Sequence, residues 1–510
     1  MRIVMKTNFK KLIYLTLIPV GIGFSGCEKF LEENPKSFLS PTNFYKTPTD
    51  AYSALVGAYD GLGSGASTYY ARSIAYLTWF PSDEALPPLL AAQRNLDDFS
   101  YGADHVDVGN FWNHVYDAIG RANIVLDKVP GIDMNNSLKE QYLAEAKFLR
   151  GLHYFNLVRI YGKVPIVTKP ITVIDDAIIE QQTVAKVYEQ IISDLEAAVA
   201  VLPTTNPNGR ATKGAALGIL SKVFLTRASS EAGQSGDYAK CAELAKQVID
   251  LGVYQLLPDY QKVIGGENEF SKESIFEWQA DRTLTSVGEQ SIYGQFTLPR
   301  NIVGYVPEAG VSGESNIVAE IPFFNKFNDL DYRKESTFIT SGKNAQGQTL
   351  TWEQFTYPYP APAWKFVNKK ATTRNAYAFG ANVIILRLAD VYLMRAEALN
   401  EINGPTTEAY AMVNAIRARA RAGNGVTSTG FPADLTGLTK DQLREAILEE
   451  RAIELAFEGH RWFDLVRTKR LVSTIKEINP TYPVSDKHNL HPIPVNEMRL
   501  NSKLIQNPGW

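Results

Sequence analysis

The densest group of ionisable side chains in this 510-residue chain lies between residues 449 and 464. Two carboxylates of such a group could serve as the acid and the nucleophile of a glycoside hydrolase, which holds them about 5–9.5 Å apart. However, Glu450, Glu454 and Glu458 recur every four residues, with arginines and apolar residues between them. This spacing places the carboxylates on one face of a helix, where arginines of neighbouring turns and helices can pair with them. We therefore interpret them as structural.

Motifs of metal binding and nucleophilic catalysis are missing from the sequence. It contains no HExxH, no paired CxxC and no GxSxG, the patterns that supply zinc ligands or an activated serine. His105 and His114 are nine residues apart, which does not suit two metal ligands on one helix. We therefore expect no metal, no cofactor and no catalytic residue, and predict that the chain is not an enzyme.

Aromatic side chains are the best candidates for binding. A protein grips a sugar by laying Trp or Tyr rings against its apolar C–H faces and polar side chains against its hydroxyls. The segment 350–364 (LTWEQFTYPYPAPAW) gathers several rings between prolines. Because the prolines restrict the loop, exposed rings in it would be pre-organised for a ligand. The predicted stacking residues are Trp352, Tyr357 and Tyr359, followed by Tyr293 and Tyr305 in the same loop-rich region.

The N-terminus is typical of an export signal that ends in a lipid-accepting cysteine. An apolar run at 12–24 follows a basic start and leads to Gly26 and Cys27. The run has about half of the ~20 residues that a bilayer-spanning helix needs. Gly26-Cys27 directly after it resembles the bacterial lipobox, whose cysteine is diacylated, so Cys27 is the predicted lipidation site. Cys241 then has no disulfide partner and is expected to be a small buried side chain in a helix.

The charge of the chain disfavours nucleic acid as a partner. The formal net charge is −3, and it becomes −7 without the four basic residues of segment 1–26. A mildly acidic protein has no electrostatic footprint for nucleic acid or anionic lipid. The 25 Tyr and 7 Trp are compatible with sugar handling but do not decide it.

Helical periodicity dominates from Asp50 onward, apart from loop-rich regions at 63–109 and 260–382. Two short runs, SIFEWQA and NVIILRL, have β-like composition. The predicted helices span residues 49–62, 110–129, 137–161, 184–201, 211–230, 237–251, 383–402, 406–421 and 439–457, with Asp133 or Ser137, Thr183 and Thr439 as N-caps.

A faint internal repeat accompanies these helices. Residues 222–230 and 390–398 share a Val-aromatic-Leu-x-Arg-Ala pattern, and 147–155 is a looser copy. Repeated helix pairs with small packing residues resemble tetratricopeptide units, which stack because one pair cannot bury its own apolar face. A generic helical bundle is the alternative on periodicity alone.

Several ordered segments point to one family. The most specific are ILEERAIELAFEGHRWFDLVR at 447–467 and HPIPVNEMRLNSKLIQNPGW at the end of the chain. The others are CEKFLEENPKS after the signal, PSDEALPP at 81–88, FWNHVYDAIGRANIVLDKV at 111–129, AEAKFLRGLHYFNLVRIYGKVPIV at 144–167, DYRKESTFI at 331–339 and RLADVYLMRAEALNEING at 387–404. Together they resemble the SusD/RagB family of Bacteroidota surface lipoproteins across essentially the whole chain after Cys27.

The resemblance implies a mainly α fold, in which tetratricopeptide-like helix pairs form a superhelical scaffold packed against a loop-rich half with short strands. It implies a lipid-anchored outer-membrane protein that faces the exterior, binds oligosaccharide or polysaccharide, and delivers it to a SusC-like TonB-dependent transporter. The alternatives are a peptide-binding lid of the same fold and, less favoured, a surface glycosidase. The expected organisation is a signal peptide at 1–26, a tether at 27–48, an N-terminal helical part at 49–259 with loop region 63–109, a ligand-binding insert at 260–382 and a C-terminal helical part at 383–510.

The resemblance also implies ligand contacts after the Ser-Asp-Glu motif at 82–84. Trp79, which precedes this motif, is expected to belong to the core. We expect the ligand to lie between the 93–101 and 350–364 loops. The implied contacts are Gln93, Arg94, Asn95, Asp97 and Tyr101.

Overall fold

The computed structural model describes residues 44–63, 68–266, 268–280, 291–305, 313–370, 380–423 and 430–510. The predicted signal peptide, Cys27 and most of the predicted tether lie outside the described residues. Within the described ranges, no helix is both long and apolar enough to cross a membrane.

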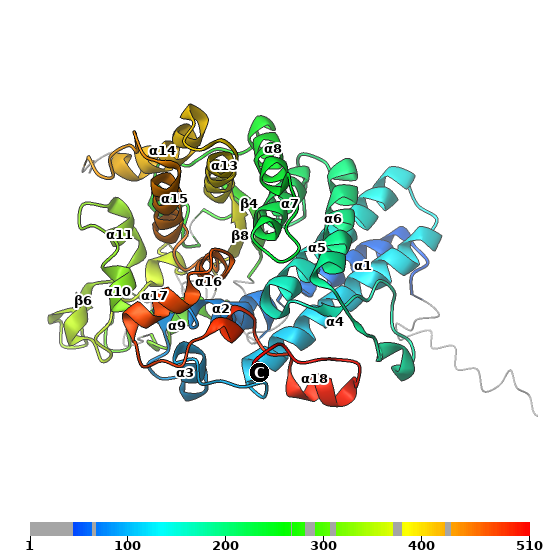
Figure 1. The fold of residues 1–510 in the computed structure, drawn as a ribbon, viewed down its shortest axis with the longest axis horizontal. Coiled ribbons are helices and arrows are strands. Elements are labelled where there is room, and N and C mark those ends of the chain that lie inside the picture. Colours follow the sequence, from blue (N-terminus) through cyan, green and yellow to red (C-terminus); the bar gives the residue numbers. More distant parts are fainter. Residues whose placement is uncertain are drawn as a thin grey trace, which may run out of the picture. The chain divides into compact units, whose positions relative to one another are not determined.

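Long helices stack side by side to form the scaffold (Figure 1). From α4 to α8, each helix packs against the next in the chain, and α13 continues the stack by packing against α8. This arrangement confirms the predicted mainly α fold. The scaffold helices are α1 (Pro48–Asp60), α4 (Val106–Lys128), α5 (Asn136–Tyr161), α6 (Val184–Val201), α7 (Lys213–Ala228), α8 (Asp237–Asp250), α13 (Leu388–Asn403), α14 (Thr407–Ala422) and α15 (Lys440–Glu454).

Polar caps mark where several of these helices begin. The hydroxyls of Thr183 and Thr439 accept hydrogen bonds from backbone N–H groups of the first turns of α6 and α15, as predicted. α5 is capped by Asn135 instead of the predicted Asp133 or Ser137, and the Asn135 side chain accepts from the N–H three residues later at 3.0 Å.

Shorter elements build the loop-rich part of the molecule. Much of the backbone between these elements is irregular, as the high content of turn-forming residues predicts. The short helices are α2 (Ile74–Trp79), α3 (Ala91–Asp97), α9 (Tyr293–Thr297), α10 (Ile321–Phe324), α11 (Tyr332–Thr337), α16 (Arg461–Arg467), α17 (Leu471–Ile478) and α18 (Val495–Leu500). The antiparallel strand pairs are β1 (Ala85–Leu86) with β5 (Val318–Ala319), β2 (Val164–Pro165) with β3 (Gln181–Gln182), β4 (Ser274–Trp278) with β8 (Val383–Arg387), and β6 (Ser341–Lys343) with β7 (Thr349–Thr351).

The two predicted β-like runs pair with each other as β4 and β8. The predicted helix at 383–402 is therefore wrong over its first five residues, which are the strand β8; the helix begins at Leu388. β-Branched Val383, Ile384 and Ile385 suit a half-buried strand. The pairing joins the loop-rich region to α13, because β8 leads directly into that helix.

A buried network of ion pairs ties the C-terminal helices to the loop-rich part. Its centre is Glu454, whose carboxylate pairs with Arg333, Arg387 and Arg419. The predicted pairing of the regularly spaced glutamates with arginines is therefore confirmed. Five acidic and five basic side chains form the network: Glu273, Asp331, Glu450, Glu454 and Glu458, with Arg333, Lys365, Arg387, Arg417 and Arg419.

Cys241 lies in α8 with no exposed surface, as predicted. Burial raises the pKa of its thiol to about 12, so the side chain packs as a neutral group.

Candidate ligand-binding site

The Ser-Asp-Glu motif fastens the first loop region to the C-terminal part of the chain. The Asp83 carboxylate accepts two hydrogen bonds from the guanidinium of Arg461, at 2.6 and 2.8 Å. The Glu84 carboxyl accepts one from the backbone N–H of Phe457 at 3.0 Å. Burial raises the pKa of Glu84 to about 8, so this carboxyl is mostly neutral at pH 7. The motif is a structural clamp rather than a surface that contacts ligand.

Short backbone pairings bring distant segments together beside this clamp. β1 follows the motif directly and pairs with β5. The N–H of Glu320 donates to the carbonyl of Glu84 at 3.0 Å, and the N–H of Ala319 donates to the carbonyl of Pro360 at 3.0 Å. The start of α10 and the predicted aromatic loop are therefore held next to the chain that leads into α3.

Tyr359 is the predicted stacking residue that lies on this face. Its ring is partly exposed. Burial and the carboxyl groups of Glu320 and Asp97 raise the pKa of Tyr359, and the guanidinium of Arg94 lowers it. Charges act on a phenol in this way only when they lie nearby. The structure thus brings part of the 350–364 loop to the predicted contacts of α3.

Asp97 and Glu320 form a pair of carboxyl groups with raised pKa values. Burial, then Glu320 and Asp98, raise the pKa of Asp97 to about 8, although Arg94 opposes the effect. Burial and Asp83 raise the pKa of Glu320 to about 7. Both residues remain partly exposed. A protonated carboxyl group can donate as well as accept a hydrogen bond, which suits the hydroxyl groups of a neutral sugar.

Two residues of this face were not predicted from the sequence, Glu320 and Tyr482. Burial raises the pKa of Tyr482, with Asp97 and Glu320 adding to the effect, which places its phenol near the same carboxyl groups. No local pattern could have identified either residue. Glu320 reaches the face because β5 pairs with β1, and Tyr482 reaches it because the chain after α17 folds back.

Trp352 lines a hollow of the surface away from the Tyr359 face. With Phe324, Tyr332 and Lys334 it lines a hollow of about 530 Å³, to which Tyr359 does not contribute. The Trp352 ring centroid is 6.2 Å from that of Phe324, and the Lys334 ammonium is 4.2 Å from the same Phe324 ring. The structure therefore separates two residues that the sequence places in one cluster. Tyr357 is partly exposed, and its carbonyl accepts a hydrogen bond from the Tyr359 N–H at 2.8 Å.

The structure corrects the prediction for Tyr293 and Tyr101, which belong to the core. Tyr293 is 1% exposed, and its hydroxyl donates to the carbonyl of Tyr70 at 2.6 Å. Tyr101 is 5% exposed, and its ring centroid lies 4.9 Å from that of Trp510. A ring in an irregular segment gives no periodic signal of its burial, so composition could not distinguish these two from Tyr359.

Gln93 and Tyr305 are also engaged within the protein. Gln93 is buried, and its carboxamide donates to the Asp107 carboxylate at 2.7 Å. The Tyr305 hydroxyl donates to the carbonyl of Ser341, and its ring meets the edge of Trp364 at a centroid distance of 5.2 Å. Of the α3 residues, exposed Arg94 and Asn95 and partly exposed Asp97 remain available to a ligand.

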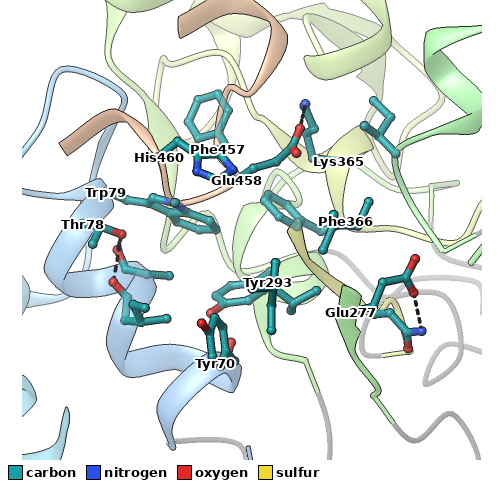
Figure 2. A pocket seen from close by; sticks show the side chains of 18 of the residues that line it. Tyr70, Thr78, Trp79, Glu277, Tyr293, Lys365, Phe366, Phe457, Glu458 and His460 are labelled. Carbon is teal, nitrogen blue, oxygen red and sulfur yellow. Dashed lines mark hydrogen bonds and ion pairs between the residues drawn. The ribbon is translucent and has the colours of Figure 1, made fainter. Parts of the chain in front are cut away.

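Tyr293 lines a cavity together with Trp79 and Phe366 (Figure 2). The three ring centroids lie 5.0 to 5.4 Å apart, and the Lys365 ammonium pairs with Glu458 at 2.8 Å on the opposite wall. The cavity volume is about 90 Å³, enough for a few water molecules. Trp79 is 3% exposed, which confirms its predicted place in the core.

Among the residues that the structure describes, no three His, Cys, Asp or Glu side chains are grouped so that they could hold a metal ion. The candidate face is built from tyrosine rings, carboxyl groups and a guanidinium. The stacked helices that carry it define a helical-repeat protein.

The chain belongs to the SusD family. The family model described as "SusD family" matches residues 272–510, and the model described as "Starch-binding associating with outer membrane" matches residues 29–225. A curated relative, SusD-like protein P2 of Formosa agariphila, is 30% identical, and the alignment covers 97% of this chain and 99% of the relative.

Solved structures agree with this assignment. A SusD homolog from Bacteroides thetaiotaomicron superposes with a TM-score of 0.80 at 27% identity, covering 92% of this chain and 98% of that chain. A laminarin-binding SusD-like protein superposes with a TM-score of 0.74 at 27% identity, covering 91% of this chain and all of that chain. The fold class predicted from the resemblance is thereby confirmed.

Proposed function

We propose that this chain binds a neutral oligosaccharide on the face formed by Tyr359, Arg94, Asp97 and Glu320. The observation that carries the proposal is a partly exposed tyrosine ring beside two carboxyl groups with raised pKa values. The ring can stack on a C–H face of a sugar, and the polar groups can bond its hydroxyls. The starch-binding family model and the laminarin-binding structure support a glycan as the ligand.

The proposed role is capture and transfer rather than chemistry. The chain would be anchored to the outer membrane through Cys27, face the exterior, and pass its ligand to a SusC-like TonB-dependent transporter. The family description that names outer-membrane association supports this location. A peptide-binding lid of the same fold is the alternative, and it would use the same scaffold with a different ligand.

A surface glycosidase is a second candidate, and one observation favours it. Asp97 and Glu320 are two neighbouring carboxyl groups, and most glycosidases use a pair of carboxyl groups. Such enzymes hold one carboxyl protonated and the other ionised at the working pH. Here burial and acidic neighbours raise both pKa values, and Arg94 lowers that of Asp97 too little to offset them. Because the same influences raise both values and no opposite shift separates an acid from a base, we favour binding over hydrolysis.

The parent protein is expected to bind laminarihexaose or maltohexaose and to leave the sugar intact. Calorimetric titration measures binding, and chromatography of the sugar after prolonged incubation measures cleavage. Asp97→Asn and Glu320→Gln provide the control for catalysis. If the parent shortened the sugar and either variant did not, the protein would be a glycosidase. Binding of a peptide library with no response to glycans would establish the peptide-binding alternative.

The predicted anchor has its own test. Cys27→Ala is expected to move the protein from the membrane fraction of cells to the soluble fraction, because the acyl chains on this residue would hold it at the bilayer. Fractionation and immunoblotting measure the distribution, and Cys241→Ala, which removes the other cysteine, should leave it unchanged. Retention of the Cys27→Ala protein in the membrane would contradict the lipid anchor.

A further inference from the structure

Arg159, near the end of α5, is a cation held by aromatic rings rather than by a carboxylate. Its guanidinium carbon lies 4.1 Å from the ring centroid of Phe155 and 3.7 Å from that of Phe463. Its Nε donates to the Phe155 carbonyl at 3.3 Å, and its Nη2 donates to the Asn156 carboxamide oxygen. In the described part of the chain, no Asp or Glu forms an ion pair with it.

The carboxylate that acts on Arg159 from within the protein already has other partners. Asp390 pairs with the Lys222 ammonium at 2.6 Å and with the Arg451 guanidinium at 2.9 Å. Burial lowers the pKa of Arg159 to about 10, so the guanidinium is still charged at pH 7. Arg159 is partly exposed, and a charge that has lost much of its water is costly unless an opposite charge compensates it. An anion supplied from outside would therefore be stabilised next to Arg159.

Arg159 also lines a pocket that can admit such an anion. The pocket has a volume of about 660 Å³, within the range of small-molecule sites. Its rim carries exposed lysines and exposed glutamates in equal number, Lys163 and Lys503 against Glu180 and Glu231. Arg467 also lines the pocket, but its guanidinium pairs with Glu397 and Asp464. Arg159 therefore provides the uncompensated charge. The inner lining includes Val158, Tyr188, Ser229, Ser230, Phe463 and Leu490.

The geometry of the guanidinium suits a carboxylate. It has five N–H donors, of which the contacts above use two, and the remaining donors include both of Nη1. Two parallel N–H groups bind two carboxylate oxygens in a bidentate pair. The stacking of Phe155 and Phe463 on the guanidinium holds its plane in one orientation, which lowers the entropic cost of binding.

We propose that this pocket binds a small carboxylate-bearing molecule, with its carboxylate paired to Arg159 and its apolar body against Phe463 and Leu490. None of the residues lining the pocket belongs to the Tyr359 face. The proposal is therefore independent of glycan binding there.

Sodium benzoate and benzamide test the proposal on the parent protein. The two molecules share a ring and a planar head group, and only benzoate is charged. Benzoate is expected to raise the midpoint of thermal unfolding by an amount that grows with the benzoate concentration. Benzamide is expected to leave the midpoint unchanged. Calorimetric titration with each molecule gives the affinity. Equal responses to the two molecules would overturn the proposal.

A variant then locates the site. Arg159→Met keeps an apolar stem between the two rings and removes the charge, so benzoate should bind about tenfold to a hundredfold more weakly. Arg300→Met makes the same substitution at an exposed arginine and should respond like the parent. An unchanged benzoate affinity in Arg159→Met would also overturn the proposal. If that variant does not fold, the comparison of benzoate with benzamide still decides the outcome.

Discussion

Replacing Glu454 with Gln is expected to lower the free energy of unfolding by about 3–5 kcal/mol. One carboxylate oxygen of Glu454 accepts hydrogen bonds from Arg387, at 2.6 Å, and from Arg419, and the other accepts one from Arg333 at 3.1 Å. Gln has nearly the same shape but no charge, and its NH2 group must face a guanidinium. The network would keep its five basic residues with one carboxylate fewer, and a buried positive charge would lose its compensation.

Urea denaturation of the two proteins measures this difference. Glu445→Gln is the matched control, because Glu445 lies on the same helix and its ion pair with Arg470 is about half exposed on the glutamate side. An exposed pair contributes about 0–1 kcal/mol. If Glu454→Gln cost no more than Glu445→Gln, the network would not stabilise the fold as described.

Acid should weaken the same network in the parent. Burial would raise the pKa of Glu454, but Arg419, Arg387 and Arg333 outweigh it and hold the value at about 2. The ordinary value of a glutamate is 4.5. Because the pKa is lower in the folded state, the contribution of Glu454 is complete above about pH 4.5 and is lost as the pH falls toward 2. Over this interval, Glu454→Gln should lose stability less steeply than the parent.

The sequence predicted the scaffold well because its signals are local and periodic. Thr183 and Thr439 begin their helices as expected, and the four-residue spacing of Glu450, Glu454 and Glu458 indicated ion pairing. The identity of the partners could not be predicted in the same way. Arg333 and Arg387 come from the loop-rich part and from the end of β8, and only the folded chain brings them to one carboxylate.

The candidate face lies in segments that the sequence singled out, but its residues could not all be predicted. The sequence placed residues of the candidate face in two loops, yet it could not distinguish buried Tyr293 from partly exposed Tyr359. Irregular backbone has no period that reveals which side faces the core. The sequence also grouped Trp352 with Tyr359, although the two side chains lie at different parts of the surface. Glu320 gave no signal, since its position depends on the pairing of β5 with β1.

Tyr359→Ala is expected to weaken the binding of laminarihexaose about tenfold to a hundredfold. Loss of a stacked ring costs roughly 1–3 kcal/mol in comparable contacts, and each 1.4 kcal/mol is a factor of ten in affinity. The Tyr359 side chain is partly exposed, so its truncation should change the midpoint of thermal unfolding little. Tyr359→Phe keeps the ring and should bind nearly as well as the parent. Calorimetric titration compares the three proteins.

Two further variants make this result specific to the proposed face. Tyr52→Ala removes a tyrosine that is 45% exposed on α1 and should bind like the parent. Trp352→Ala tests the hollow beside Phe324. If Trp352→Ala greatly weakened laminarihexaose binding while Tyr359→Ala bound like the parent, Trp352 would be the stacking residue. The carboxyl groups of Asp97 and Glu320 would then have no part in binding. A loss in Tyr359→Ala alone would leave the ligand on the Tyr359 face, where the raised pKa values of both carboxyl groups favour an uncharged sugar.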